Sequence, residues 1–332
     1  MTSLAYSPNG LLLASGSEDT ICLVWNVADQ RVFLSLEHSE KSVSALAFSS
    51  DNATLASASQ DGKVILWCTL EWLEYMELAT ETPAQTLAYS SDGTLLIAGT
   101  RDGTLAIWDI EEDYTPLPPM KYHDAAIIFM KFSSDGSTMV TGGLECDCVV
   151  WDVPSLRTTE PRMRKIGDGR VIFAAALSPN GDRVITAFED GSYTIWSAES
   201  GEALHSICEH DAQVSAIEFS PDGQLVVSGA EDGSVRVVDS CTGLRRLSLG
   251  GSGYMITTAL FSPNGRFVCA GGEDRATHIW RVDDGEAVLT CRDHNADLTH
   301  VLFSPDGRML ASAALDGTVH IRSIASITAP DY

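Results

Sequence analysis

The feature that most constrains this chain is an internal repeat of about 42 residues that runs along its whole length. A short segment that begins with serine returns eight times. The copies are Ser-Pro-Asn-Gly at 7–10, 178–181 and 262–265, Ser-Ser-Asp-Asn at 49–52, Ser-Ser-Asp-Gly at 90–93 and 133–136, and Ser-Pro-Asp-Gly at 220–223 and 304–307. Proline fixes φ, and the Asp/Asn-Gly pair accepts positive φ, so each copy is typical of a hairpin turn. A fixed period of this length indicates one structural unit repeated along the chain.

An acidic residue follows each turn and forms a second repeating column. The acids are Asp19, Asp61, Asp102, Glu145, Asp190, Asp232, Asp274 and Asp316, at intervals of 42, 41, 43, 45, 42, 42 and 42 residues. Six residues after each acid stands a third column: Trp25, Trp67, Trp108, Trp151, Trp196, Val238, Trp280 and Arg322. The segments between acid and tryptophan are mostly apolar, which is typical of a strand covered on both faces.

Four extended segments fit each repeat, with tight turns and no helical period. This pattern predicts an all-β chain of antiparallel sheets packed face to face. The Ser-Pro-Asp-Gly turn, the turn acid and the tryptophan, with Trp-Asp at 108–109 and 151–152, resemble WD40 repeats over essentially the whole chain. The resemblance implies an eight-bladed β-propeller with four-stranded antiparallel blades in one domain, 1–332. The expected blades are approximately 1–38, 39–79, 80–123, 124–166, 167–210, 211–252, 253–294 and 295–332.

The eighth repeat leaves room for only a truncated outer strand, because ten residues follow Arg322. We therefore expect the last blade to lack a full outer strand and to present an open edge, which invites pairing. Two explanations stay open. The chain is a fragment of a longer protein, or a partner or second copy covers the edge.

The net charge and the cysteines limit the classes of partner and the cellular compartment that we expect for this chain. The chain has 332 residues with 21 Lys+Arg against 46 Asp+Glu, a formal charge of −25, which disfavours nucleic acid and anionic membranes. The N-terminal region has no apolar run long enough for a signal peptide or a membrane span. Eight scattered cysteines favour reduced thiols, and hence a cytoplasmic protein.

Histidines near the blade boundaries imply a buried hydrogen-bond network, which the family builds from His, Ser/Thr, the turn acid and Trp. Two sets match: His38, Ser57, Asp61 and Trp67, and His123, Thr141, Glu145 and Trp151. The same residue types would suit a nucleophilic triad. They recur on separate repeats without an oxyanion-hole motif, however, which favours a structural role. We expect no enzyme activity and no cofactor, and the spacing of Cys146-Asp147-Cys148 does not suit zinc.

The rim formed by the turns beside the acids is the face that the family most often uses for partners. The residue before the acid is Glu18, Arg101, Leu144, Glu189, Glu231 or Glu273 in six of the repeats. Apolar residues near the start of the first strand are Ile128, Val171, Phe173 and Met255. These ten residues are the candidate partner-binding set. An alternative stays open for Val171 and Phe173, which could instead pack into the end of the core.

The segment 154–170 carries five basic residues against two acidic ones. It is either a solvated loop paired with the chain's own acids or a docking site for an acidic partner.

The leading hypothesis for the chain is a non-catalytic scaffold that binds a basic or partly apolar protein or peptide on the rim. The alternatives are a sensing segment of a larger signalling protein, since the regular array resembles those of fungal-type NTPases, and a propeller enzyme.

Overall fold

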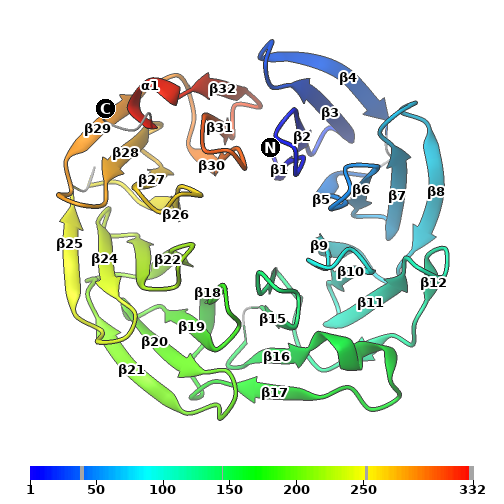
Figure 1. Cartoon of the computed structure of the whole chain (residues 1–332), viewed down its shortest axis with the longest axis horizontal. Coiled ribbons are helices and arrows are strands. Elements are labelled where there is room, and N and C mark those ends of the chain that lie inside the picture. The colour runs from blue at the N-terminus through cyan, green and yellow to red at the C-terminus, as the bar shows by residue number, and fades with distance from the viewer. Residues whose placement is uncertain (38–40, 144, 251–252, 329–332) are drawn as a thin grey trace. The chain divides into compact units, whose positions relative to one another are not determined.

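The computed structural model describes residues 1–37, 41–143, 145–250 and 253–328. The chain divides into two compact units, Met1–Met163 and Arg164–Tyr332. Each unit is a series of antiparallel sheets that follow one another along the chain, labelled by their strands in Figure 1. We call these sheets blades 1 to 8, and we call the strands of a blade a to d in chain order.

Unit 1 begins with blade 1 and runs to the division, which falls within β17 of blade 4. Blade 1 has β1 (Ser3–Tyr6), β2 (Leu12–Gly16), β3 (Ile21–Asn26) and β4 (Arg31–Glu37), and blade 2 has β5 (Val43–Phe48), β6 (Thr54–Ser59), β7 (Lys63–Cys68) and β8 (Glu74–Ala79). Blade 3 has β9 (Ala84–Tyr89), β10 (Leu95–Thr100), β11 (Thr104–Asp109), β12 (Thr115–Pro116) and β13 (Met120–Lys121). Blade 4 has β14 (Phe129–Phe132), β15 (Thr138–Gly142), β16 (Cys148–Asp152) and β17 (Met163–Ile166), with a 3-10 helix η1 (Val153–Arg157).

Unit 2 contains the remaining blades. Blade 5 has β18 (Ile172–Leu177), β19 (Arg183–Phe188), β20 (Ser192–Ser197) and β21 (Ala203–Cys208), and blade 6 has β22 (Val214–Phe219), β23 (Leu225–Ala230), β24 (Val235–Asp239) and β25 (Arg245–Leu249). Blade 7 has β26 (Ile256–Phe261), β27 (Phe267–Gly272), β28 (Thr277–Arg281) and β29 (Ala287–Cys291). Blade 8 has β30 (Leu298–Phe303), β31 (Met309–Ala314) and β32 (Val319–Ser323), followed by the short helix α1 (Ala325–Thr328).

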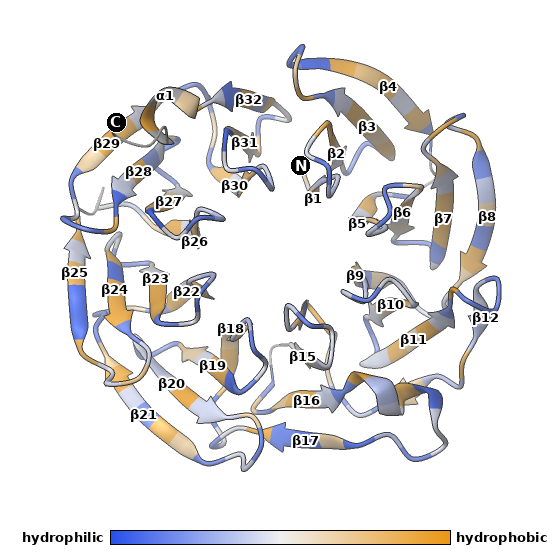
Figure 2. Ribbon diagram, viewed as in Figure 1, coloured by the Kyte–Doolittle hydropathy of each residue, from blue (hydrophilic) through white to orange (hydrophobic). Residues whose placement is uncertain are grey.

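Burial separates the inner strands from the outer strand of a blade. All six residues of β10 are buried, whereas β8 exposes most of its residues and buries Leu78. Figure 2 shows the same contrast, with β11 and β23 largely hydrophobic and much of β17 and β25 hydrophilic. Strands b and c therefore lie between neighbouring blades, while strand d alternates between the core and solvent.

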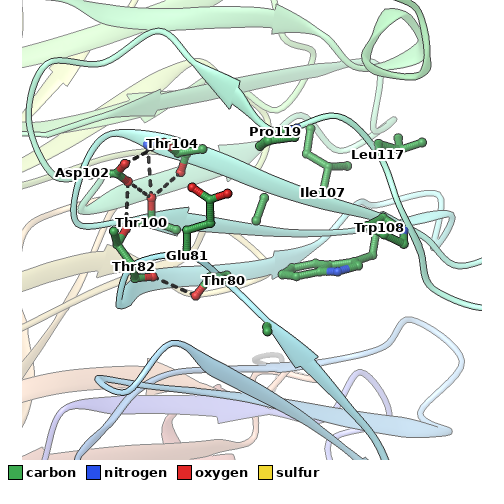
Figure 3. A pocket seen from close by; sticks show the side chains of 13 residues that line it. Thr80, Glu81, Thr82, Thr100, Asp102, Thr104, Ile107, Trp108, Leu117 and Pro119 are labelled. Carbon is green, nitrogen blue, oxygen red and sulfur yellow. Dashed lines mark hydrogen bonds between the residues drawn. The ribbon is translucent and has the colours of Figure 1, made fainter.

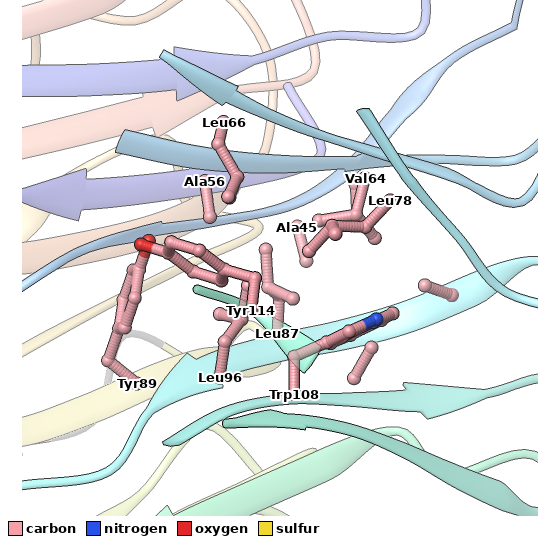
Figure 4. Close-up of a cluster of buried hydrophobic side chains, with 13 residues drawn as sticks. Ala45, Ala56, Val64, Leu66, Leu78, Leu87, Tyr89, Leu96, Trp108 and Tyr114 are labelled. Atoms are coloured by element: carbon pink, nitrogen blue, oxygen red, sulfur yellow. The ribbon is translucent and has the colours of Figure 1, made fainter. Parts of the chain in front are cut away.

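Neighbouring blades within a unit pack through mixed apolar clusters. Between blades 2 and 3, Val64 and Leu66 of β7 share a cluster with Leu87, Leu96 and Trp108 (Figure 4). Val64, Leu66 and Leu96 are fully buried. Burying each such side chain contributes about 1.5–3 kcal/mol, so the packing between blades is a main source of stability.

The prediction of an all-β fold with eight antiparallel blades is confirmed. Blade 3 differs in detail, because the segment 115–121 contains three prolines and its outer strand is divided into β12 and β13. Proline has no N–H to donate to a sheet, which explains the interruption. In the described residues blade 8 has three strands, and Ile324 just before α1 and Ile327 within α1 pack on its core. No helix in the described ranges is long and apolar enough to span a membrane.

Candidate functional site

The turn acids lie in the turns between strands b and c, where they organise the local backbone. Asp61 accepts a hydrogen bond from the Lys63 amide at 3.0 Å, and Asp232 accepts one from the Ser234 amide at 2.8 Å. This contact two residues along the chain is the typical aspartate turn. Its recurrence at Asp19, Asp190, Asp274 and Asp316 gives the acids a role in shaping the turns.

Blade 4 contains a continuous buried network. Trp151 Nε1 donates to Thr141 Oγ1 at 2.8 Å, and Thr141 Oγ1 lies 2.8 Å from His123 Nε2. Glu145 binds His123 Nδ1 through Oε1 and accepts from the Asp124 amide through Oε2 at 3.1 Å. Each group is satisfied if Thr141 donates to Nε2 and His123 Nδ1–H donates to Glu145. The hydroxyl is thus buried between an indole and an imidazole.

In blade 2 the indole N–H of Trp67 donates to Ser57 Oγ at 2.8 Å. Asp61 stabilises the turn as described above, and His38 lies outside the described residues. The pair formed by Trp67 and Ser57 returns as Trp25 with Ser15 in blade 1 and as Trp196 with Thr186 in blade 5. The serine or threonine of strand b therefore anchors the tryptophan of strand c.

Blades 6 and 8 have networks that the sequence analysis did not identify, because the tryptophan is absent there. His210 Nε2 lies 2.7 Å from Ser228 Oγ, and its Nδ1 lies 2.8 Å from Ser234 Oγ, which donates to Asp232. His294 binds Ser312 and Thr318 in the same way. The detectable signal was the histidine 18 residues before the serine of strand b, the same separation as that of His123 and Thr141. Burial lowers the pKa of both His210 and His294, which favours their neutral forms.

The acids of blades 3, 5 and 7 have other partners. In blade 5, Arg170 contacts Asp190 and Ser192, and its guanidinium lies 3.6 Å from the Phe188 ring centroid. In blade 7, His278 Nε2 lies 2.6 Å from Asp274. In blade 3, three threonines surround Asp102. Arginine, histidine or threonine side chains thus contact the turn acids of these three blades. Within the described ranges, no three His, Cys, Asp or Glu side chains lie close enough together to hold a metal ion.

In unit 2 the candidate glutamates directly follow strand b of three consecutive blades. Glu189, Glu231 and Glu273 are all exposed. The Glu231 amide donates to Gln213 O at 2.9 Å, and the Glu273 amide donates to Met255 O at 3.0 Å. These backbone bonds fix the glutamates next to the loop that enters strand a.

The apolar members of the candidate set are unequally exposed. In unit 2, Val171 is 42% exposed, whereas Phe173 and Met255 are half-buried. Two exposed residues outside the predicted set lie on the same rim: Tyr254 at 57% and Leu315 at 65%. Leu315 occupies the same repeat position as the glutamates, which was a usable signal, whereas nothing in the glycine-rich sequence around Tyr254 marked it.

The candidate residues in unit 1 are more scattered. Glu18 and Arg101 are exposed in blades 1 and 3, and Ile128 is 42% exposed in blade 4. Leu144 lies outside the described residues. Unit 1 therefore does not have the run of glutamates on consecutive blades that unit 2 has.

Three of the five basic residues in the segment 154–170 pair with the chain's own acids. Arg157, at the end of η1, makes a two-pronged contact with Asp109, with Nε–Oδ2 at 2.7 Å and Nη2–Oδ1 at 3.2 Å. Arg162 pairs with Asp152. In unit 2, Arg170 pairs with Asp168 as well as Asp190. The segment also contains most of η1 and all of β17, so it has more regular structure than the loop that the sequence suggested.

We expect Arg157→Met to lower the free energy of unfolding by about 1 kcal/mol at neutral pH, because Asp109 would lose its charged donors. The side chain of Asp109 is only 11% exposed. Arg157 lowers the pKa of Asp109, so this contribution is present above the unfolded-state pKa of about 3.9 and is lost as pH falls through the lower folded value. Urea unfolding at neutral and acidic pH measures it.

Arg162→Met is the matched control, because its partner Asp152 lies in an exposed pair and Arg162 itself is 77% exposed. Its expected cost is at most a few tenths of a kcal/mol, about the size of a surface ion pair. Equal losses for the two variants, or a loss for Arg157→Met that persists in acid, contradict the assignment.

Comparison with known proteins agrees with this architecture. The family model "WD domain, G-beta repeat" (WD40) matches residues 1–26, 31–68, 80–109, 115–152, 201–239, 244–281 and 285–323. These segments cover more than half of the chain, which therefore belongs to the WD40 repeat family. They do not include 153–200, where the structure nevertheless forms strands β18, β19 and β20 of blade 5.

A solved structure similar to the chain is that of the computationally designed Ika8 protein, with a TM-score of 0.83 and 26% identity, covering 97% of this chain and 96% of that one. Periodic tryptophan protein 2 of Arabidopsis thaliana is 39% identical over 82 residues, and Pre-rRNA-processing protein IPI3 of Mycosarcoma maydis is 34% identical over 67 residues. These matches cover 25% and 20% of this chain but only 9% and 11% of the two relatives. WD40 propellers are generally non-catalytic scaffolds that bind proteins, and family membership therefore suggests a protein-interaction scaffold.

Proposed function

We propose that the chain is a non-catalytic scaffold that binds a basic segment of a partner protein. The binding surface is the rim formed by the turns between strands b and c of blades 5 to 7. The observation that carries this proposal is the regular placement of Glu189, Glu231 and Glu273. All three are exposed, and among the described residues none of them forms an ion pair. Acids without partners at matching positions on neighbouring blades attract a segment that carries several lysines or arginines.

Exposed apolar groups on the same rim support a mixed contact rather than a purely electrostatic one. Val171 and Tyr254 precede strand a of blades 5 and 7, and Leu315 follows strand b of blade 8. Apolar side chains exposed among charged ones are typical of a protein contact surface. The proposed ligand is therefore a peptide segment in which basic residues alternate with apolar ones.

Fluorescence anisotropy with a labelled peptide of lysine, arginine and leucine tests the proposal. Replacing Glu189, Glu231 and Glu273 together by lysine should weaken binding by at least about tenfold, because three attractive contacts become repulsive. The matched control replaces Glu199 and Glu202 of blade 5 and Asp283 of blade 7 by lysine, which gives the same change in net charge. These exposed acids lie in the c–d loops, at the ends of the two blades opposite to the rim. The control should bind nearly as well as the original protein.

Equal loss in both triple variants would show that net charge alone drives binding, and retention of binding in the rim variant would place the contact elsewhere. Either result contradicts the proposal, provided that circular dichroism shows both variants to be folded.

Cytoplasmic location is part of the same proposal. It is supported by the eight cysteines, all of which are free thiols.

A further inference from the structure

Blade 3 contains a cavity of about 160 Å³ beside its interrupted outer strand. β12 pairs with the end of β11 at Trp108 and Asp109, and β13 pairs with its start at Thr104 and Leu105. Between them, residues 117–119 belong to neither strand, although the Leu117 amide still donates to Ile107 O at 2.8 Å. Ala106 in the middle of β11 is paired with no residue of β12 or β13. The cavity lies in this gap, between β11 and the loop that follows β8 (Figure 3).

One end of the cavity is acidic, and its main acid is held in a fixed orientation. Asp102 Oδ1 accepts from Thr100 Oγ1 at 2.6 Å and from Thr82 Oγ1 at 2.8 Å, and Oδ2 accepts from Thr104 Oγ1 at 3.1 Å. These hydrogen bonds, that from Thr100 first, lower the pKa of Asp102 to about 2. A carboxylate offers about four acceptor sites. Oδ1 is therefore saturated, whereas Oδ2 retains one site for a further donor.

Glu81, on the loop after β8, brings a second carboxylate to the cavity. Figure 3 shows it between the threonine cluster around Asp102 and the apolar residues Ile107 and Trp108. The chain's own Lys121 already approaches Asp102, with Nζ 3.8 Å from Oδ2. Lys121 is 62% exposed and does not line the cavity. Its position brings an ammonium group close to Oδ2, the oxygen of Asp102 that retains one acceptor site.

The other end of the cavity is apolar. Trp108, Ile107, Leu117 and Pro119 form its walls, opposite Asp102 in Figure 3. Ala98 stands ten residues before Trp108, where blades 1, 2, 4 and 5 have the hydroxyl that binds the indole N–H. A dry cavity of about 150 Å³ is large enough to hold a benzene molecule, so this one has room for a chain of four methylene groups.

We propose that this cavity binds the side chain of a lysine from a partner protein. The methylene chain lies along Trp108 and Leu117, and the ammonium donates to Asp102 Oδ2 and Glu81. Lysine fits better than arginine because Thr100 and Thr82 occupy Oδ1, which prevents the two-pronged contact that a guanidinium makes with a carboxylate. The three N–H donors of an ammonium group can instead bind separate acceptors, one on Asp102 and one on Glu81. The inference goes beyond the rim proposal, because the cavity lies in unit 1 and its binding can be tested with a lysine analogue in place of a partner protein.

The experiment is an NMR titration of the ¹⁵N-labelled protein with Nα-acetyl-lysine N-methylamide. The readout is the indole resonance of Trp108, assigned by its loss in Trp108→Phe. The expected result is a saturable shift with a millimolar Kd. The arginine analogue should bind at least about fivefold more weakly, and the Nε-acetylated lysine analogue should give no saturable shift, because it has lost the charge.

Three variants test the assigned roles. Asp102→Asn keeps an acceptor for the threonines but loses the charge, and it should weaken binding by about tenfold or more. Ala106→Leu fills the gap beside β11 and should abolish the shift. Lys121→Ala removes the competing ammonium and should tighten binding. Asp135→Asn, another acid held by serine hydroxyls but located in the β14–β15 hairpin, is the matched control and should leave binding unchanged.

The proposal is overturned by the absence of a saturable shift in the folded original protein, by equal binding of the lysine and Nε-acetyl-lysine analogues, or by unchanged affinity in both Asp102→Asn and Ala106→Leu. Thermal unfolding by circular dichroism checks that each variant is folded. The rim proposal rests on residues of unit 2 and on a peptide probe, so the failure of one proposal is distinguishable from the failure of the other.

Discussion

Thr141→Val should lower the free energy of unfolding by about 2–4 kcal/mol, although it preserves the shape of the side chain. The hydroxyl of Thr141 accepts from Trp151 Nε1 and binds His123 Nε2, both at 2.8 Å. All three residues are at least 99% buried. Valine would remove the acceptor of the Trp151 indole N–H and the donor to His123 Nε2, although His123 Nδ1 would keep its contact with Glu145. Each unsatisfied buried group costs about 1–3 kcal/mol. Urea unfolding followed by tryptophan fluorescence measures the loss.

Thr186→Val in blade 5 is the matched control. Thr186 is equally buried and accepts from Trp196 Nε1 at 2.8 Å, but no histidine bond to it is seen among the described residues. It should therefore cost about half as much, about 1–2 kcal/mol. Losses of equal size would show that the histidine contributes nothing, and no loss in either variant would refute the view that these hydroxyls stabilise the blades.

Gly272→Ala should lower the free energy of unfolding by about 3 kcal/mol and should also weaken peptide binding at the rim. A Cβ on Gly272 would lie 1.9 Å from Met255 O and 3.0 Å from Ile256 Cα. Both are backbone atoms, so no side-chain rotation relieves the contact, and overpacking of this kind costs about 1–3 kcal/mol or more. The displaced Met255 carbonyl is the acceptor for the Glu273 amide, which links the fold to the rim.

Gly250→Ala is the control for this prediction, because among the described residues, its chain neighbours aside, no atom lies within 4 Å of the corresponding Cβ. It should change the urea midpoint only slightly, and it should leave peptide anisotropy unchanged. If Gly272→Ala behaves like Gly250→Ala in both measurements, the close approach between β27 and the Met255 carbonyl does not constrain the sequence.

The sequence predicted the blades because their determinants are local. The turn at 90–93 and the column at Trp108 each specify a hairpin or a strand through residues close together in the chain, and repetition made both patterns visible. The networks of blade 4 followed from the resemblance for the same reason. The inner strands were predictable because strands such as β10 and β27 have nearly continuous apolar sequences.

The partners of individual acids were not predictable, because they depend on contacts between distant segments. Arg157 and Asp109 are 48 residues apart in the sequence. Arg170, three threonines or a histidine on strand c can each satisfy a turn acid, and no sequence pattern common to all of them indicates this. The cavity of blade 3 lies where the outer strand is interrupted between β12 and β13, and the spacing of the repeats does not reveal how an outer strand is divided.

The turns that define the repeat also affect how the chain folds. In blade 3 the Ser90 amide donates to Leu95 O at 2.9 Å and the Leu95 amide donates to Ser90 Oγ at 2.9 Å, contacts between residues five apart. Contacts between blades, such as that from Ser44 Oγ to Ala84 O, join residues 40 apart. Closing the short loops costs far less entropy, and hairpins form within microseconds. Folding can therefore start independently at each of the repeated hairpins, before the slower docking of one blade on the next.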